Sequence, residues 1–278
     1  MLCCDWRAQT GHEGSGNLIG TDDAYKIKRL ADDVHALIAG DPSEATELLA
    51  ECRTAVKEFV AASEKAKGDD VDIVVSAFQR SLREAAGKRK EEIIKNYVRQ
   101  RSGMTHEQLR QTPRHEFTEF HEHLWMEVRQ LTLGADIILC ALCCETPLII
   151  KLDRFGKVSW VNNYCTVGTG AEVARGLLCL QPWAQEQIDG SLQLPGLAEC
   201  IFRVFEAKQA AHIADPQSVG EATSLQILLP DMLGLVGLTR DFFAKIVNTF
   251  NSKHCVPEIS SDLMDILGSG TPMKWRSK

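Results

Sequence analysis

The chain has 278 residues, of which 44% are hydrophobic and 25% charged, and its net charge is −7 at neutral pH. This composition is ordinary for a globular protein, and the negative charge gives no electrostatic footprint for nucleic acid. The longest apolar run, Ile137–Cys144, is far too short to cross a bilayer. The ten cysteines are scattered, several lie in apolar runs, and no secretory leader pattern opens the chain. We therefore expect a reduced, cytoplasmic protein with no nucleic-acid or membrane partner.

The first forty residues predict strands and turns. Leu2–Cys4 is a short apolar strand that runs directly into a polar turn, and the Gly-rich stretch 11–23 is typical of a loop. Residues 24–41 predict a hairpin with Asp32-Asp33 as its turn. Because a core strand needs neighbours and nothing precedes Leu2, we expect a first strand of the fold to be missing from this sequence.

Two helical regions follow the hairpin. Residues 41–66 predict a helix, since Pro42 suits a first turn and apolar residues recur at helical spacing. Residues 71–131 predict a second helical region that is strongly charged after Ser81. Its pattern breaks near Ser102-Gly103 or Pro113.

The apolar period then changes to that of strands. Residues 134–170 predict a three-strand meander with turns at Glu145-Thr146-Pro147 and at Asp153–Gly156. The remaining elements are two helices, a strand, a last helix and a polar tail, over residues 171–180, 194–215, 222–230, 239–250 and 251–278. Strands that cluster in blocks indicate an α+β fold rather than an alternating parallel sheet.

Four short motifs lie in order along these elements. They are Asp5-x-Arg7-Ala8, the interval from Lys26 to Ala39-Gly40, Gly168-Thr169-Gly170, and Asp215-x-x-Ser218-x-Gly220. In this order the motifs resemble those of the proteasome-type N-terminal-nucleophile hydrolases. The resemblance covers roughly residues 2–240, with Gln9 where the family has Thr and Thr169 where it has Ser.

The resemblance implies a four-layer αββα sandwich. Residues 1–250 would form a single domain with an enlarged helical insertion at about 80–130, and 251–278 a tail. The family implies a threonine-type peptide hydrolase that acts on peptide or protein substrates, needs no cofactor or metal and assembles into a homo-oligomeric ring. The nucleophilic Thr of the family starts a strand before the position that Asp5 matches, and nothing here occupies that place. The resemblance thus implies an N-terminally incomplete chain, inactive as given.

Three residues of the resemblance would act on the reacting groups. Lys26 would lower the pKa of the nucleophilic hydroxyl or relay its proton, and Asp5 would orient Lys26. The backbone N–H of Gly40 would donate to the oxyanion.

Three further residues, Thr169, Asp215 and Ser218, would support the α-amine of the nucleophile and fix its direction. On the residues alone, each of these positions also suits a purely structural role. Asp5 is typical of a polar turn, Lys26 of a solvated charge, and Asp215-Pro216 of a helix stop.

Other classes of function stay open. A non-catalytic structural or interaction module would keep the same fold, and an amidohydrolase acting on small amides would also suit it. His115, His121 and His123 are six and two residues apart, a spacing that gathers no metal site on one helix face. Cys140 and Cys143 are three apart in a strand, so they should point to opposite faces and pack as core residues.

Overall fold

The computed structural model describes residues 2–5, 8–10, 19–21, 26–67, 70–113, 115, 118–144, 146–180, 185–186, 192–193, 197–220, 223–228 and 235–237. Over these residues the chain is an α+β protein, as the sequence predicts, with six helices and an open five-stranded antiparallel sheet. It divides into a central unit, Arg29–Asn162, and a terminal unit made of Met1–Lys28 and Asn163–Lys278. No helix in the described parts is long and apolar enough to span a membrane.

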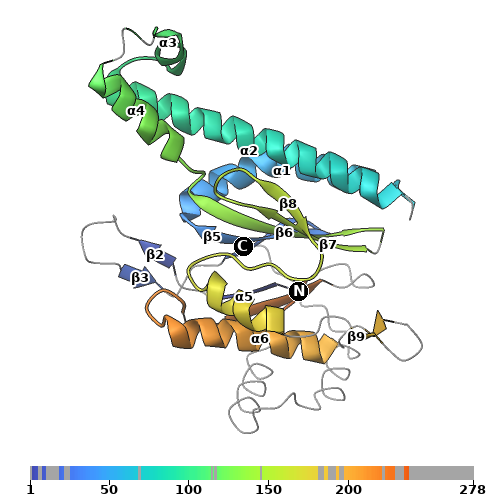
Figure 1. The fold of residues 1–278 in the computed structure, drawn as a ribbon. Coiled ribbons are helices and arrows are strands. Elements are labelled where there is room, and N and C mark those ends of the chain that lie inside the picture. The colour runs from blue at the N-terminus through green and yellow to red at the C-terminus, as the bar shows by residue number, and fades with distance from the viewer. Residues whose placement is uncertain are drawn as a thin grey trace, which may run out of the picture. The chain divides into compact units, whose positions relative to one another are not determined.

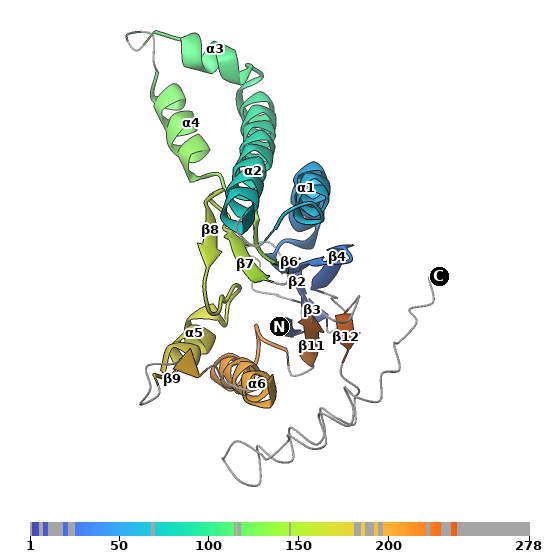
Figure 2. The same ribbon diagram turned by 90° about the vertical axis from the view of Figure 1, so that its right-hand side faces the viewer.

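The central unit is built on the five-stranded sheet (Figures 1 and 2). Its strands follow one another in chain order: β4 (Ile27–Ala31), β5 (Val34–Gly40), β6 (Ala135–Cys143), β7 (Thr146–Leu152) and β8 (Val158–Val161). The predicted hairpin is confirmed as β4 and β5, with Asp32 and Asp33 forming the turn. The predicted meander is confirmed as β6, β7 and β8.

One predicted turn of the meander is misplaced. Thr146 and Pro147 already belong to β7, where they lie opposite Cys143 and Leu142. The chain reverses earlier because Cys144 adopts a positive φ of 49°, which allows a tighter turn than the sequence pattern suggested.

Two long helices, α1 (Pro42–Ser63) and α2 (Val71–Ser102), cover one face of this sheet (Figure 2). The carboxylate of Asp41 caps α1 by accepting hydrogen bonds from the N–H groups of Ser43 and Glu44, at 2.8 and 3.0 Å. The second helix, α2, ends at Gly103, whose φ of 71° is that of a left-handed helix cap. The predicted break at Ser102-Gly103 is therefore confirmed.

Beyond this break lie two shorter helices, α3 (His106–Gln111) and α4 (Glu119–Gln130). Together with the C-terminal part of α2 they form a small cluster of their own, which buries Val98, Leu109, Leu124 and Val128. Since α2 has 32 residues, it is about 48 Å long, and this cluster lies at its end, away from the sheet (Figure 1). The strongly charged stretch predicted after Ser81 lies along α2 itself, up to the point where this cluster begins.

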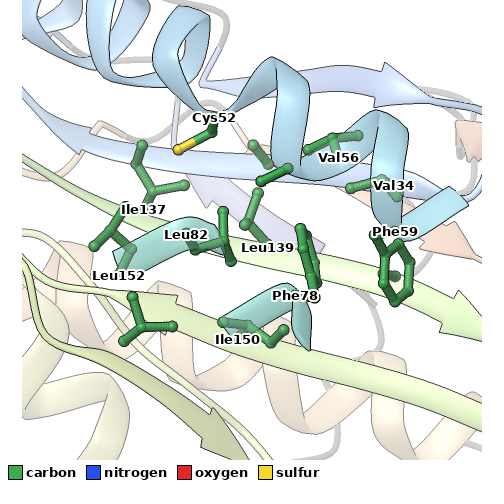
Figure 3. Packing of buried hydrophobic residues seen from close by; sticks show 14 of the residues in the cluster. Val34, Cys52, Val56, Phe59, Phe78, Leu82, Ile137, Leu139, Ile150 and Leu152 are labelled. Atoms are coloured by element: carbon green, nitrogen blue, oxygen red, sulfur yellow. The ribbon is translucent and has the colours of Figure 1, made fainter. Parts of the chain in front are cut away.

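The core of the central unit fills the space between the sheet and the two long helices (Figure 3). Phe59 of α1 stacks on Phe78 of α2, with ring centroids 4.4 Å apart. Strand residues reach this core at every second position, as the alternation of side chains along a strand requires. Cys143 belongs to this core and Cys140 does not, which confirms that the two cysteines point to opposite faces of β6.

The terminal unit contains a smaller sheet and two helices. In the sheet, β1 (Leu2–Asp5) and β12 (Leu235–Gly237) flank β11 (Thr223–Leu228), and both pairings are antiparallel. The helices α5 (Ala171–Leu180) and α6 (Leu197–Ala214) pack on each other, and α6 also contacts β1. These elements confirm the predicted strands at 2–4 and 222–230 and the predicted helices at 171–180 and 194–215.

Short hairpins complete this unit. One pairs β2 (Ala8–Thr10) with β3 (Ile19–Thr21), and another pairs β9 (Gln185–Glu186) with β10 (Leu192–Gln193). The stretch 11–23, predicted as a loop throughout, is thus wrong at Ile19–Thr21, because three residues are too few to show a strand period. The predicted helix over 239–250 lies outside the described residues.

Candidate functional site

Two of the sequence motifs meet in the terminal unit. The Gly168–Gly170 turn precedes α5, and the Asp215–Gly220 turn follows α6. Gly170 lies against α6 so closely that an added Cβ would come within 2.8 Å of the Ala211 Cβ and 2.9 Å of the Val219 Cγ2. A residue with any side chain would push these two turns apart, so glycine at 170 keeps the motifs in contact.

The second of these turns is held by Asp215. Its carboxylate oxygen accepts a hydrogen bond from the N–H of Ser218 at 3.0 Å, and Val219 N–H returns to the Asp215 carbonyl at 3.0 Å. Hydrogen bonds from the Ser218 hydroxyl and from its backbone N–H hold the pKa of the Asp215 carboxyl below its usual value. Asp215 is therefore a carboxylate at neutral pH, and its hydrogen bonds with Ser218 close the turn.

A third motif, that of Asp5, is brought near the Asp215–Gly220 turn by strand pairing. Asp5 is the last residue of β1, and its register partner is Thr223, the first residue of β11. Thr223 follows Gly220 by three positions in the sequence. The backbone thus places Asp5 beside the strand that continues from the Asp215–Gly220 turn, although the two motifs are 210 residues apart (215 minus 5).

Lys26 and Thr169 are placed less distinctively. Lys26 is half-buried and stands directly before β4. Thr169 is exposed in its turn, where the hydroxyl of the nearby Thr166 donates to the Ala171 carbonyl at 3.0 Å. Both positions suit a site that opens to solvent.

Gly40 belongs to a different setting, the end of β5 in the central unit. It has a φ of +110°, and a Cβ there would lie 2.4 Å from the Gly134 carbonyl oxygen. The next N–H, that of Asp41, donates to this same oxygen at 3.0 Å. Glycine is thus required at position 40 by a close backbone approach within the protein.

The central unit also holds polar groups that the sequence analysis did not single out. The Asp136 carboxylate accepts three hydrogen bonds from Arg154, from its N–H, Nε and Nη2 at 2.9, 3.0 and 2.7 Å. The guanidinium of Arg89 is largely buried and pairs with Glu44, Glu47 and Glu92. Except for Arg89–Glu92, which are three residues apart on α2, these pairs join residues at least 18 positions apart in the sequence, so no local pattern predicts them.

His35 is the most unusual of these groups. Its side chain is only 1% exposed, and neither ring nitrogen has a hydrogen-bond partner among the described residues. One local signal was available, a lone histidine inside the apolar run Val34–Ala39.

The described histidines and cysteines form no metal cluster. No group of three His, Cys, Asp or Glu side chains in the described ranges converges on a point that could hold a metal ion. His121 instead caps its own helix, with Nδ1 accepting a hydrogen bond from Thr118 N–H at 3.2 Å.

Comparison with known proteins adds no relative. No protein-family model matches this chain, and no curated protein matches it significantly.

Proposed function

We propose that this chain is a proteasome-like subunit of the N-terminal-nucleophile class, a threonine-type peptide hydrolase whose nucleophile is supplied from outside these residues. The observation that carries the proposal is the meeting of motifs in the terminal unit. The turns around Thr169 and Asp215 touch through Gly170, and Asp5 is paired to the strand that follows. The resemblance of the motifs does not by itself require that these three segments, which lie far apart in the sequence, be neighbours in the fold.

The central sheet supports the sandwich that this class of protein is built on. Val34, Ala36 and Ile38 of β5 face α1 and α2, yet Leu37 on the opposite face is buried as well. The same holds in β6, where Ile138 and Cys140 are buried but do not belong to the core between the sheet and the helices α1 and α2. A sheet buried on both faces is what the inner layer of an αββα arrangement needs, and here the face opposite the helices also carries the buried polar residues His35 and Asp136.

The chemistry of such a subunit would use the charges already described. The Asp215 carboxylate, held ionised by Ser218, would stabilise a protonated α-amine, the group that shuttles the proton of the attacking hydroxyl. Asp5 and Lys26 would pair beside it, with Lys26 favouring the ionised hydroxyl. The substrate class that follows is a peptide or protein.

A non-catalytic subunit of the same fold is the second candidate, and Gly40 favours it. The left-handed backbone of Gly40 is fully accounted for by its contact with Gly134, without any oxyanion. Asp215 likewise has a structural role in closing its own turn. Such a subunit would help build a ring without performing hydrolysis.

The decisive experiment is to purify the protein from its natural source and determine its intact mass and first residue. A mature chain that starts with Thr upstream of Asp5 would support the hydrolase. Hydrolysis of fluorogenic peptides by that chain should then be lost in Lys26→Ala and Asp5→Asn, and kept in Lys28→Ala, a matched surface control. A mature chain that starts at Met1 or Leu2 would leave only the non-catalytic subunit.

Ring assembly is tested separately by native mass spectrometry at micromolar concentration. Both candidates predict a homo-oligomer, in which the α2–α4 cluster is a surface free to meet a neighbouring subunit. A strictly monomeric mass would overturn the ring in either case.

A further inference from the structure

His212 lies in the last turn of α6, just before the turn that carries Asp215 and Ser218. Its Nδ1 is 2.6 Å from the carbonyl oxygen of Val219, a residue seven positions further along the chain. Because a carbonyl oxygen can only accept a hydrogen bond, Nδ1 carries the proton and is the donor. The imidazole therefore ties the end of the helix to the far side of the turn that follows it.

The other hydrogen bonds of this turn do not fix its far side in the same way. The N–H groups of Ser218 and Val219 both donate to Asp215, to its carboxylate and its carbonyl oxygen, each at 3.0 Å. These two bonds begin and end within the turn. The N–H of Asp215 donates to the Ala211 carbonyl at 3.0 Å, which holds only the near end. The bond from His212 is the one in this set that joins the far end of the turn to the helix.

Val219 is also the residue through which this turn meets the other motif of the terminal unit. Its side chain is buried, and a Cβ added to Gly170 would come within 2.9 Å of its Cγ2. Gly170 directly follows Thr169 in the sequence. Holding the Val219 carbonyl therefore fixes how the turn of Asp215 lies against the turn of Thr169, so one hydrogen bond acts on both motifs.

A histidine near the end of a helix has a simpler use, since a positive charge there is stabilised by the helix dipole. That effect needs no directed contact, whereas the Nδ1 of His212 is within 2.6 Å of a specific carbonyl oxygen outside the helix. The donor is also present in both charge states, because Nδ1 carries a proton in this neutral tautomer and in the imidazolium. The contact therefore suits a permanent tie better than a response to charge.

We propose that His212 is a positioning residue of the candidate site, which holds the turn of Asp215 and Ser218 against the turn of Thr169. It acts through Val219 and not on the substrate. The inference rests on the proposed function as far as catalysis is concerned, since Thr169, Asp215 and Ser218 would support the α-amine of the nucleophile. Loss of the hydrogen bond then lowers turnover and leaves substrate binding unchanged.

Two substitutions separate the hydrogen bond from the bulk of the side chain. Asn and Leu have nearly the same shape, but Nδ2 of Asn can donate from about the place of the imidazole Nδ1, so His212→Asn keeps the donor and His212→Leu removes it. Ile213→Ala is the matched surface control, because Ile213 is the next residue and is 72% exposed. His212→Ala also lacks the donor and covers the case in which the leucine variant fails to fold.

The first readout is amide hydrogen exchange of the full chain, resolved to single residues by electron-transfer fragmentation. His212→Leu should speed exchange at Ser218 and Val219 about tenfold, the change in a local opening equilibrium that loss of one hydrogen bond produces. Exchange at residues 201–207 of α6 should not change. His212→Asn and Ile213→Ala should exchange like the unmodified protein throughout.

Two exchange results would overturn the proposal. Equal exchange at Ser218 and Val219 in His212→Leu and His212→Asn would show that the donor does not hold the turn. Faster exchange along the whole of α6 in the leucine variant would show that the helix opens and not the turn alone.

The second readout tests the effect on catalysis, with the variants produced in the natural host and purified as mature chains. In hydrolysis of fluorogenic peptides, His212→Leu should lower kcat about tenfold at unchanged KM, and His212→Asn should restore it. An unchanged kcat in a leucine variant that exchanges faster would overturn the positioning role. A complete absence of hydrolysis in the unmodified chain would instead refute the proposed hydrolase, and the exchange experiment alone would then decide whether His212 holds the turn.

Discussion

At the scale of single residues, the backbone of Gly40 is tied to Gly134. A Cβ at position 40 would lie 2.4 Å from the Gly134 oxygen and 2.9 Å from the Ala135 Cα, and neither backbone atom can give way cheaply. With the cost of its positive φ added, Gly40→Ala should destabilise the protein by about 3 kcal/mol in urea unfolding.

Gly103→Ala is the matched control for this prediction. Gly103 also has a positive φ, 71°, but an added Cβ there meets nothing within 4 Å. It should lose only about 1 kcal/mol, the backbone part of the effect. Equal losses in the two variants would mean that the close approach to Gly134 does not matter.

Asp136 offers a second prediction at this scale. Asn in its place keeps the shape but removes the charge, and its single oxygen cannot replace both Oδ2, which receives Nε and Nη2 of Arg154, and Oδ1, which receives the Arg154 N–H. Because the carboxylate is nearly buried, Asp136→Asn should lower the free energy of unfolding by about 2 kcal/mol. Glu172→Gln, which breaks the exposed pair with Arg175, should leave the unfolding midpoint unchanged.

At the scale of elements, Arg89 joins the two helices that cover the sheet. From α2 it reaches Glu44 at 2.9 Å and also Glu47, both on α1, while its own side chain is only 12% exposed. Arg89→Met should therefore cost about 2 kcal/mol, since it leaves Glu44 half-buried without its partner. Thermal unfolding followed by circular dichroism measures the loss.

A control for Arg89 lies on the same helix. Lys95 pairs with Glu91 at 2.9 Å, but both side chains are more than half exposed. Lys95→Met should hardly change the melting temperature. If it lowered the temperature as much as Arg89→Met, loss of charge along α2, and not the link to α1, would be the cause.

These elements also show what a sequence can predict. The Asp41-Pro42 helix start and the Asp32-Asp33 turn depend on neighbouring residues, and the structure has both where the pattern indicated. The β2–β3 pairing was missed because three-residue strands carry too few side chains to show a period. Arg89 and Glu44 are 45 residues apart, so their pairing follows from how α1 lies on α2, which no local window contains.

The candidate site divides in the same way. Asp215 and Ser218 are three residues apart, and their hydrogen bond is a local turn that the motif predicted. The contact of Gly170 with Ala211 depends on how α5 packs on α6, so the sequence alone did not imply it. The sequence did not single out His35, because the alternation along β5 puts it on the sheet face opposite α1 and α2 but cannot show that its ring nitrogens lack hydrogen-bond partners among the described residues.

At the scale of the whole molecule, stability should depend on pH through His35. Its pKa is about 4 in the folded protein and about 6.5 when the chain is unfolded, so the unfolded state binds the proton more tightly. The fold loses no stability through His35 above pH 6.5, where the imidazole is neutral in both states. As the pH drops from 6.5 toward 4, the free energy of unfolding falls because the unfolded chain takes up the proton first. Between pH 7.5 and pH 5 the free energy of unfolding should fall by about 1–2 kcal/mol, with solvent screening taken into account.

Two carboxyl groups, those of Asp41 and Asp215, should cause a second loss of stability at lower pH, separate from the loss caused by His35. Hydrogen bonds from Ser43 and Glu44 lower the pKa of Asp41, and those from Ser218 lower the pKa of Asp215. Their contribution is present above pH 3.8 and is lost only as the pH falls further, below the window of His35. In urea titrations at a series of pH values, the free energy of unfolding of His35→Leu should hardly change between pH 7.5 and 5, and its fall below pH 4 should be the same as in the unmodified protein. A variant that kept the full slope above pH 5 would show that burial of His35 does not set the acid sensitivity of this fold.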